Sequence, residues 1–462
     1  MATGTIDGYL GGEVYPTGFH RQFTPQWIDA MLRHRGVAPP RRQERAPFTL
    51  LDLGCGDGLA LIGLAAAHPE GRFVGIDALP EHVERGTAAA AYAGLTNVGF
   101  FCRLFADVED PVAPAFDYVT AQGVLAWVSP ANREHVRRLC GRHVKPGGVA
   151  CVGYNTMPGW SGGLAVQQML CLLAEEQEGN AVDRYAAALE KVRAIVRAGT
   201  PGNEARFLAW LDQISETLPA RYFPHEYLNR HWQPLWSGQE HAAMARHGLA
   251  YAGPSRAEML RAEFILHPNQ IEELARIKGD EARETALDVM MNQTFRIDLF
   301  AKGLVSATHS DAARMKGWWA AATNEEEAEF ALRSAAVTVE FDGPAARGVL
   351  VELARGPARV CDIAGSLGKV SDADLLYAID ALWTSGQILP CDPPIEPPDA
   401  AMFNRLNVAA AREGMPLPAL VGTHGAMPVT HATIVAADDG DPVALAAIAR
   451  LGIRLRSPAA GG

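Results

Sequence analysis

The stretch that decides the fold runs from Phe48 to Gly58 and reads Phe-Thr-Leu-Leu-Asp-Leu-Gly-Cys-Gly-Asp-Gly. Its first six residues are almost continuously apolar, which is typical of a strand buried on both faces of a parallel sheet. A glycine-rich turn follows at once, and the largely apolar segment 59–69 after it predicts a helix. Glycines in such a turn permit positive φ angles and let a ligand approach the backbone. The turn alone is a weak signal, because dinucleotide dehydrogenases use a similar one.

Further strands and helices alternate along the chain after this turn. Such alternation predicts βαβ units and a parallel sheet with both faces covered. Two later segments, 241–253 and 294–303, contain strand patterns that we expect to complete the same sheet, and the mostly helical stretch 164–217 would then be an insertion over its carboxyl edge. The segments that predict the other strands and helices are 72–77, 80–95, 97–107, 116–124, 132–144 and 146–155.

Three acidic residues stand at the ends of successive strands in this scheme. Asp52 precedes the first glycine of the turn, Asp77 ends the second strand, and Phe105-Ala106-Asp107 follows the third. A carboxylate at the turn suits a cationic amino-acid group and repels a pyrophosphate, whereas an acid after the second strand is placed to accept hydrogen bonds from ribose hydroxyls. An apolar wall with an acid suits an adenine ring and its amino group. Together they indicate S-adenosylmethionine rather than NAD.

These motifs resemble those of a class I S-adenosylmethionine-dependent methyltransferase. The resemblance rests on LDLGCGDG (51–58), VGID (74–77) and LFAD (104–107) with the late strand pair. The segments YPTGF, QGVLAWV, VGYNTMPGW, HEYLN and NQTFRIDLF further resemble bacterial methyltransferases that carry a methyltransferase regulatory domain. That family includes rickettsial protein-lysine methyltransferases that modify an outer-membrane protein.

The resemblance implies roles for individual residues on the cofactor side. Gly54, Gly56 and Gly58 would form the turn around the methionine and ribose, and Asp77 would hold the ribose hydroxyls. Phe105, Ala106 and Asp107 would flank the adenine. Gln122 would face the sulfonium at the end of the fourth strand, and Tyr15 would lie over the cofactor. The chain departs from its relatives at Leu125, where they often carry tyrosine, so no tyrosine role is expected there.

The resemblance and the patterns together predict four regions and an α/β fold. Residues 1–163 would form the S-adenosylmethionine-binding core of a Rossmann-like, seven-stranded methyltransferase sheet, and 164–305 a helical insertion and regulatory-type region that completes it. Residues 306–390 would form a mostly helical, winged-helix-like module, with three helices in 345–390 that look like a separate small unit. Residues 391–462 would be a linker and C-terminal region.

The acceptor side should lie beyond the carboxyl end of the fifth strand. Tyr154, Asn155 and Trp160 follow that strand and are the candidate catalytic residues. Tyr and Asn can accept hydrogen bonds from an amine, and Trp can shelter a methylated ammonium by a cation–π contact. The alternative is that Asn155 turns the chain and Trp160 belongs to the core. His225, beside Glu226 and Tyr227, is a weaker candidate for a general base.

Composition excludes several classes of protein. With 48% hydrophobic and 20% charged residues the chain is not a disordered one. Its 41 Lys+Arg against 53 Asp+Glu give a net charge of −12, which argues against nucleic-acid and membrane partners. The seven cysteines are scattered and form no CxxC pair, which favours a cytoplasmic protein without a metal site. The N-terminus carries no signal-peptide pattern, and no apolar run reaches membrane-spanning length.

We therefore expect methyl transfer from S-adenosylmethionine to a protein lysine. A small-molecule or natural-product acceptor is the alternative within enzymes, and a non-catalytic, cofactor-binding regulatory protein is the alternative outside them. The winged-helix-like unit does not favour DNA, because its last helix carries three aspartates and no Lys or Arg between 371 and 383. It is instead a candidate for packing, dimerisation into a homodimer, or contact with a protein substrate.

Overall fold

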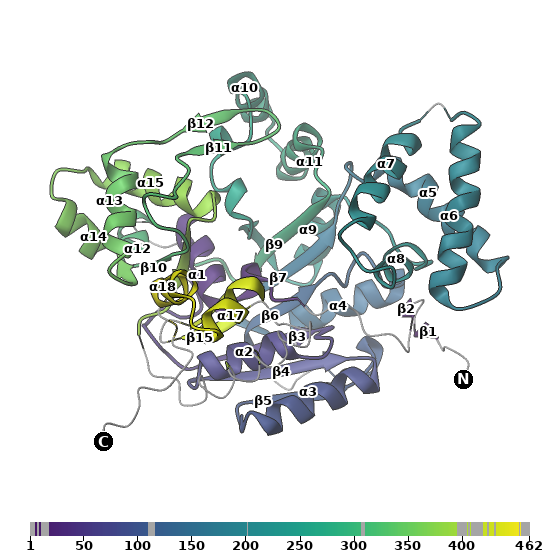
Figure 1. The fold of residues 1–462 in the computed structure, drawn as a ribbon, viewed down its shortest axis with the longest axis horizontal. Coiled ribbons are helices and arrows are strands. Elements are labelled where there is room, and N and C mark those ends of the chain that lie inside the picture. Colours follow the sequence, from purple (N-terminus) through teal and green to yellow (C-terminus); the bar gives the residue numbers. More distant parts are fainter. Residues whose placement is uncertain are drawn as a thin grey trace.

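A computed structural model gives the fold of the chain (Figure 1). The residues that it describes are 5–6, 9–10, 18–109, 116–200, 202–305, 310–394, 404, 407, 419–422, 425–428, 431–451 and 453.

The centre of the molecule is a seven-stranded sheet in the order β5-β4-β3-β6-β7-β9-β8. Only β9 runs against its neighbours β7 and β8, and the other adjacent pairs are parallel. This confirms that the two late strand patterns complete the sheet begun at Phe48. The strands are β3 (Phe48–Leu53), β4 (Gly71–Asp77), β5 (Val98–Cys102), β6 (Phe116–Gln122), β7 (Val144–Asn155), β8 (Ala250–Pro254) and β9 (Phe295–Ala301).

Helices cover both faces of the sheet, because the buried strands point apolar side chains to each side in turn. Leu50 packs into the core that contains α1 and α2, whereas its neighbour Leu51 packs into the core on the side of α4 and α9. The helices concerned are α1 (Pro25–His34), α2 (Leu59–Ala67), α3 (Pro80–Tyr92), α4 (Pro130–His143) and α9 (Ser237–Arg246).

The predicted helical insertion forms a lobe at the right of Figure 1, which we call the α5–α8 lobe. Its helices are α5 (Ser161–Glu175), α6 (Ala181–Arg197), α7 (Glu204–Ser215) and α8 (Tyr222–Tyr227). The lobe has a hydrophobic core of its own, built around Val166, Leu170, Val192 and Leu211. It is therefore a small packed body rather than a loose cover.

The C-terminal module, residues 310–394, contains the three predicted helices α13 (Pro344–Leu353), α14 (Val360–Leu367) and α15 (Asp372–Thr384), and the strand β14 (Ile388–Cys391). Ser371 caps α15, since its hydroxyl accepts the Asp374 N–H at 3.1 Å. Two strands that were not predicted, β10 (Trp318–Ala321) and β13 (Ala358–Arg359), join β14 in an antiparallel sheet.

The C-terminal module packs directly against the rest of the chain. Trp383 of α15 packs edge-on against Trp27 of α1, with ring centroids 5.0 Å apart, and against Trp319 at 4.9 Å. These rings belong to one continuous hydrophobic core that also holds the α1 face of the sheet. The module is thus fused to the sheet through α1.

Shorter elements complete the description. None of the helices in the described ranges is both long enough and apolar enough to cross a lipid bilayer. The remaining elements are β1 (Thr5–Ile6), β2 (Tyr9–Leu10), η1 (Arg21–Phe23), η2 (Phe105–Asp107), η3 (Ala257–Met259), η4 (Ala262–Phe264), α10 (Pro268–Arg276), α11 (Asp280–Met291), α12 (Ser310–Arg314), β11 (Ala331–Arg333), β12 (Thr338–Glu340), β15 (Ala419–Gly422), β16 (Gly425–Pro428), α17 (His431–Asp438) and α18 (Pro442–Arg450).

Candidate active site

The glycine turn between β3 and α2 has the geometry that its sequence predicts. Gly54, Gly56 and Gly58 have φ angles of 79°, 57° and 70°. A Cβ atom on Gly54 would lie 2.6 Å from Cγ2 of Val124, and one on Gly58 would overlap the Phe100 ring. A Cβ on Gly56 would meet no heavy atom of the described residues within 4 Å. Gly54 and Gly58 are therefore needed for packing, while Gly56 leaves its backbone open to a ligand.

Asp77 is fixed beside this turn at the carboxyl end of β4. Its Oδ2 accepts the Gly56 N–H at 2.9 Å, and its Oδ1 accepts the Leu79 N–H at 2.9 Å. Nδ1 of the buried His82 lies 3.2 Å from Oδ1. Burial lowers the pKa of His82, but the hydrogen bond and charge of Asp77 outweigh it and raise that pKa. Because each carboxylate oxygen has two lone pairs, Oδ2 of Asp77 can still accept a hydrogen bond from a ribose hydroxyl.

Asp52 lies at the carboxyl end of β3, next to the same turn. The Thr120 hydroxyl donates to its Oδ1 at 2.7 Å. Burial raises the pKa of Asp52 to about 6; the hydrogen bond from Thr120 opposes this rise, and the charge of Asp77 adds to it. The negative charge of Asp77 makes Asp52 harder to ionise, so a cationic ligand beside Asp52 would relieve this repulsion.

The other predicted cofactor residues lie in η2, after β5, and at the end of β6. Phe105 is half-buried in η2, and its Cζ would be 3.9 Å from a Cβ on Gly54. Ala106 and Asp107 are exposed on the same short helix. Gln122 is half-buried at the end of β6, in register with Gly153 of β7.

Tyr15 lies outside the described residues, so its predicted position over the cofactor stays a prediction. Leu125, where relatives often carry tyrosine, is fully buried in the core.

The structure separates Tyr154 from the other two candidates for the acceptor side. Tyr154 is fully buried, and its hydroxyl donates to Oδ2 of Asp298 at 2.5 Å. Asp298 also lies 2.9 Å from Nε2 of His241 and forms an ion pair with Arg296. Burial raises the pKa of Asp298, but the charge of Arg296 and the bond from His241 bring it down to about 2. This arrangement favours a structural role for Tyr154 over the predicted contact with an acceptor.

Arg296 is the centre of that buried cluster. Its guanidinium donates to Asp288 at 2.8 Å and to Glu284 at 2.7 Å. It also donates to the Tyr251 hydroxyl at 2.8 Å. The cluster joins β8, β9 and α11 to β7, and so fixes the strand that carries the acceptor side.

Trp160 belongs to a group of aromatic rings between β7 and the α5–α8 lobe. Its ring centroid lies 5.2 Å from that of Trp232 and 5.6 Å from that of Trp210, and Trp127 lies 6.0 Å from Trp232. We call these four residues the tryptophan cluster. The Trp160 indole N–H donates to the Thr294 carbonyl at 2.7 Å, which fixes its ring at the start of β9. Trp160 and Trp127 are half-buried, so their rings are only partly used by packing.

The segment 229–235 brings Trp232 to this place. Its Gln233 N–H donates to the carbonyl of Ala126 at 2.8 Å, and its Leu235 N–H donates to the carbonyl of Asn155 at 2.9 Å. The segment therefore lies along the carboxyl ends of both β6 and β7. Asn155, nine-tenths buried at the end of β7, lies directly beneath it.

Sequence reasoning missed three residues of this site, which are His82, Trp210 and Trp232. His82 falls five residues after Asp77, on the helix that starts at that strand end, and this spacing is a usable signal. Trp232 carries no local signal, because only the tertiary fold brings 229–235 back to the sheet.

His225, the weaker candidate for a base, is buried in α8 within the lobe. In the described part of the chain, His, Cys, Asp and Glu side chains form no group of three that could hold a metal ion.

Comparisons with known proteins agree with this geometry. A family model described as a methyltransferase domain matches residues 50–148, and one described as a predicted methyltransferase regulatory domain matches residues 219–302. The first match contains the glycine turn and Asp77. The second contains the segment 229–235, β8, β9 and the Arg296 cluster.

Relatives are found in several bacteria. A protein of Synechocystis sp. described as uncharacterized is 23% identical over 299 residues, which cover 64% of this chain and 58% of the relative. One of Rickettsia prowazekii, also described as uncharacterized, is 26% identical over 254 residues, which cover 54% of this chain and 45% of the relative. The chain thus spans about half the length of these two curated relatives.

A solved structure has the same fold over most of the chain. The structure described as PKMT2 from Rickettsia typhi in complex with AdoHcy superimposes with a TM-score of 0.69 at 18% identity, covering 91% of this chain and 87% of that chain. A methyltransferase domain built on the Gly54–Gly58 turn is thus followed in this chain by a methyltransferase regulatory domain.

Proposed function

We propose that this protein transfers a methyl group from S-adenosylmethionine to the side-chain amine of a protein lysine. The observation that carries the proposal is the tryptophan cluster at the carboxyl ends of β6 and β7, beside the glycine turn of the same sheet. The solved structure named PKMT2, which has the same fold, supports the lysine acceptor through its name, which denotes a protein-lysine methyltransferase.

When bound, S-adenosylmethionine supplies a methyl group on a sulfonium, and transfer forms an N–C bond while the C–S bond breaks with its electron pair left on sulfur. The residues of this chain contribute orientation and exclusion of water. Asp77 would hold the ribose hydroxyls, and Asp52 would face the amino-acid group of the methyl donor. Gln122 would lie on the sulfonium side.

The tryptophan cluster would act on the acceptor. A lysine amine must be neutral to attack, and removal of the ammonium from water lowers its pKa. The half-buried rings of Trp127 and Trp160 offer an apolar wall for the lysine stem and π faces for its cationic head. The proton released on methylation would leave through solvent, so the proposal assigns no fixed base.

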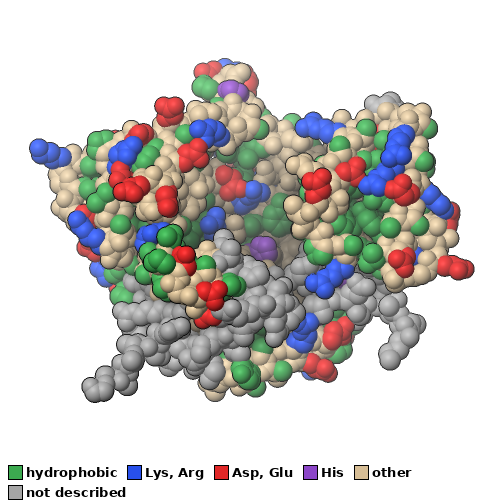
Figure 2. All heavy atoms as spheres, in the orientation of Figure 1, with side chains coloured by type: hydrophobic (Ala, Val, Ile, Leu, Met, Phe, Trp, Pro, Cys, Tyr) green, Lys and Arg blue, Asp and Glu red, His purple; other side chains and the backbone are tan. Residues whose placement is uncertain are grey.

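The shape of the molecule supports a large acceptor. Figure 2 shows the molecule hollowed between the α5–α8 lobe and the C-terminal module, over the region where Figure 1 draws β7 and β9. Acidic and basic side chains line this hollow. A broad opening with charged walls admits a segment of another protein, whereas most small-molecule sites enclose their ligand. The free cysteines of the described chain fit a cytoplasmic setting for this reaction.

Two measurements test the proposal in sequence. Titration calorimetry with S-adenosylmethionine, S-adenosylhomocysteine and NAD⁺ tests the methyl donor, and we expect binding of the first two only. Transfer of tritiated methyl groups is then measured into a library of lysine-containing peptides and into a matched library with arginine in place of lysine. We expect label in the lysine library alone, recovered after hydrolysis as Nε-methyl-lysine.

The outcomes separate the alternatives. Cofactor binding with label in small metabolites but in neither library would favour a small-molecule acceptor. Cofactor binding without transfer to any acceptor would favour a regulatory protein. Binding of NAD⁺ in place of S-adenosylmethionine would overturn the proposal at its first step.

A further inference from the structure

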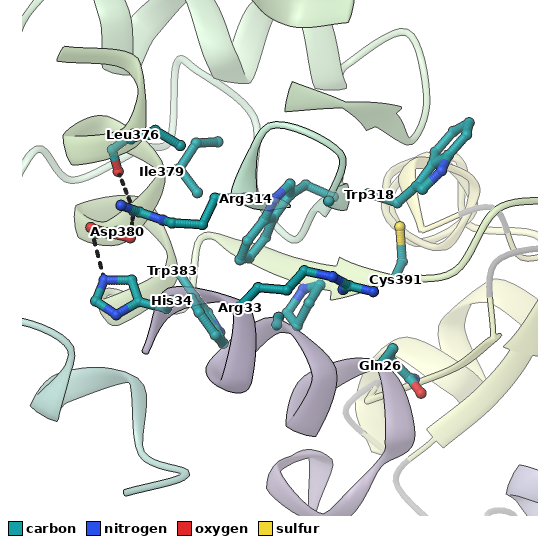
Figure 3. A pocket seen from close by; sticks show the side chains of 14 residues that line it. Gln26, Arg33, His34, Arg314, Trp318, Leu376, Ile379, Asp380, Trp383 and Cys391 are labelled. Atoms are coloured by element: carbon teal, nitrogen blue, oxygen red, sulfur yellow. Dashed lines mark hydrogen bonds and ion pairs between the residues drawn. The ribbon is translucent and has the colours of Figure 1, made fainter. Parts of the chain in front are cut away.

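A cavity lies at the seam between α1 and the C-terminal module (Figure 3). Its volume is about 30 Å³. Its apolar walls include Ile379 and the aromatic rings of Trp318, Trp319 and Trp383. The methyl-transfer proposal gives this cavity no role.

Three buried polar atoms of the cavity residues have no hydrogen-bond partner among the residues that the structure describes. They are Nε1 of Trp383, Oε1 of Gln26 and Nδ1 of His34. Trp383 is 1% exposed and Gln26 is 4% exposed, so neither side chain is bathed in bulk solvent. Buried polar groups in folded proteins are nearly always paired, and an unpaired one calls for an explanation. Three unpaired polar atoms in residues that line one cavity indicate that a polar molecule occupies it.

The charges around the cavity show what kind of occupant it suits. Asp380 is already surrounded by cations, since Arg314 donates to it at 2.6 Å and Arg261 at 2.7 Å. The Arg33 side chain makes no hydrogen bond or ion pair with the described residues, although its charge acts on the carboxylate of Asp29. Figure 3 shows the Arg33 guanidinium on the side of Cys391, away from Asp380. Arg33 is thus available to bind an anionic group.

The unpaired atoms add a second requirement. Nε2 of His34 lies 3.2 Å from Asp380, and burial lowers the pKa of His34, so the neutral ring donates from Nε2 and leaves Nδ1 as an acceptor. Gln26 Oε1 is an acceptor as well. The occupant must therefore offer donors to His34 or Gln26, and an anionic oxygen to Arg33 and the Trp383 N–H.

We propose that this cavity is a binding site for a small carboxylic acid that also carries an ammonium or hydroxyl donor, that is, a small amino acid or hydroxy acid. The carboxylate binds Arg33 and the Trp383 N–H, and the donor binds Gln26 or His34. Such a ligand contacts α1 and the C-terminal module at once. It therefore stabilises their contact, which lies on the same core as the sheet.

The test uses the full chain and the indole N–H signals of its nine tryptophans in ¹⁵N NMR spectra. Trp383→Phe assigns the Trp383 signal. Glycine and glycolate are the probes, and they distinguish an ammonium donor from a hydroxyl donor. Acetate lacks the donor, and inorganic phosphate tests for binding of any oxyanion. We expect glycine or glycolate to shift the Trp383 signal saturably, with half-saturation in roughly the millimolar range, and at least about tenfold more tightly than acetate or phosphate.

Arg33→Gln should abolish the shift, and Arg72→Gln, an exposed arginine on β4, is the matched control that should keep it. A second readout needs no signal assignment: saturating probe should raise the Tm of the wild type and of Arg72→Gln but not that of Arg33→Gln. A shift equal for all four probes, a shift that persists in Arg33→Gln, or no saturable shift would each overturn the proposal, the last meaning that water alone fills the cavity.

Discussion

Three glycines with nearly equal backbone angles have very different surroundings. Gly56, Gly58 and Gly94 have φ angles of 57°, 70° and 72°. A Cβ on Gly58 would overlap Phe100, whereas one on Gly56 or on Gly94 would meet no described heavy atom within 4 Å. The backbone strain of an alanine is therefore similar at all three positions. An alanine at position 58 would in addition overlap Phe100, and one at position 56 would in addition obstruct the bound ligand.

Alanine substitutions separate these three contributions. Gly94→Ala should lower the free energy of unfolding by about 1–2 kcal/mol, the cost of a left-handed non-glycine residue. Gly58→Ala should lower it by about 2–5 kcal/mol, because overpacking against Phe100 adds to the strain. Gly56→Ala should match Gly94→Ala in urea unfolding and yet lose S-adenosylmethionine binding in calorimetry. Normal binding by Gly56→Ala would contradict our placement of the ligand.

Asp77 offers a sharper test of the ribose site. In Asp77→Asn one charged acceptor becomes a neutral donor, so hydrogen bonds from ribose hydroxyls weaken. We expect the Kd for S-adenosylmethionine to rise by about 10- to 100-fold, since a hydrogen bond to a charged group contributes about 1.5–3 kcal/mol. Calorimetry measures this, with Glu109→Gln as a nearby exposed control. An equal loss in both variants would show a general charge effect.

The raised pKa of Asp52 predicts a pH dependence of binding. Asp52 titrates at about 6 in the free protein, and only its ionised form attracts a cationic amino group. Below pH 6, S-adenosylmethionine binding should therefore weaken by up to about tenfold per pH unit and release a proton. Calorimetry in buffers of different ionisation enthalpy measures that proton. Asp52→Asn should bind more weakly at pH 8 and show no such slope between pH 5 and pH 7.

At the level of elements, apolar patterning predicted the sheet well. Each central strand is buried on both faces and flanked by a turn, so its position was visible in the sequence. The same double burial hid the orientation of Tyr154. Along β7, Cys151 packs toward α1 while Val152 and Tyr154 pack toward α4, and with both faces apolar no pattern distinguishes them.

Other features depend on tertiary contacts alone. The two-residue strand β13 is too short to carry a pattern. The segment 229–235 lacks periodicity, and it becomes part of the candidate site only because backbone hydrogen bonds join it to Ala126 and Asn155. Motifs thus predicted the cofactor side, where the ligand binds a local turn, and predicted less of the acceptor side, which is assembled from distant segments.

The Arg296 cluster tests how the regulatory-type region is joined to the sheet. Arg296→Met keeps the volume of the side chain but leaves Asp288 and Asp298 buried without their cation. We expect it to lower the free energy of unfolding by about 3–5 kcal/mol, the usual effect of breaking a buried ion pair. Arg276→Met is the control, because Arg276 pairs with Glu273 on the surface and should contribute at most about 1 kcal/mol. Urea unfolding compares them, and equal effects would contradict the proposed anchoring.

On the scale of the whole molecule, the cores do not follow the order of the chain. The C-terminal module shares a core with α1 and the sheet, whereas the α5–α8 lobe, in the middle of the sequence, has its own. We expect the lobe to open without unfolding the rest, because local stability follows shared buried contacts.

Native-state hydrogen exchange at low urea measures this directly. Amides of α6 should exchange through an opening of lower free energy than amides of β3. Amides of α15 should exchange together with those of β3, although α15 is farther from β3 in the sequence than α6 is. Exchange of α15 ahead of α6 would contradict a shared core, and a single opening for all three elements would contradict the independence of the lobe.

The placement of β9 between β7 and β8 affects how the chain is made on the ribosome. β7 ends at Asn155, but its partner β9 begins only at Phe295. At about 5–20 residues per second, synthesis of the 139 residues from 156 to 294 takes roughly 7–30 s, during which β7 is an unpaired apolar edge. Exposed edges of this kind recruit other strands. The lobe is synthesised in that interval and has a hydrophobic core of its own, so we expect it to fold early enough to shield the nascent edge.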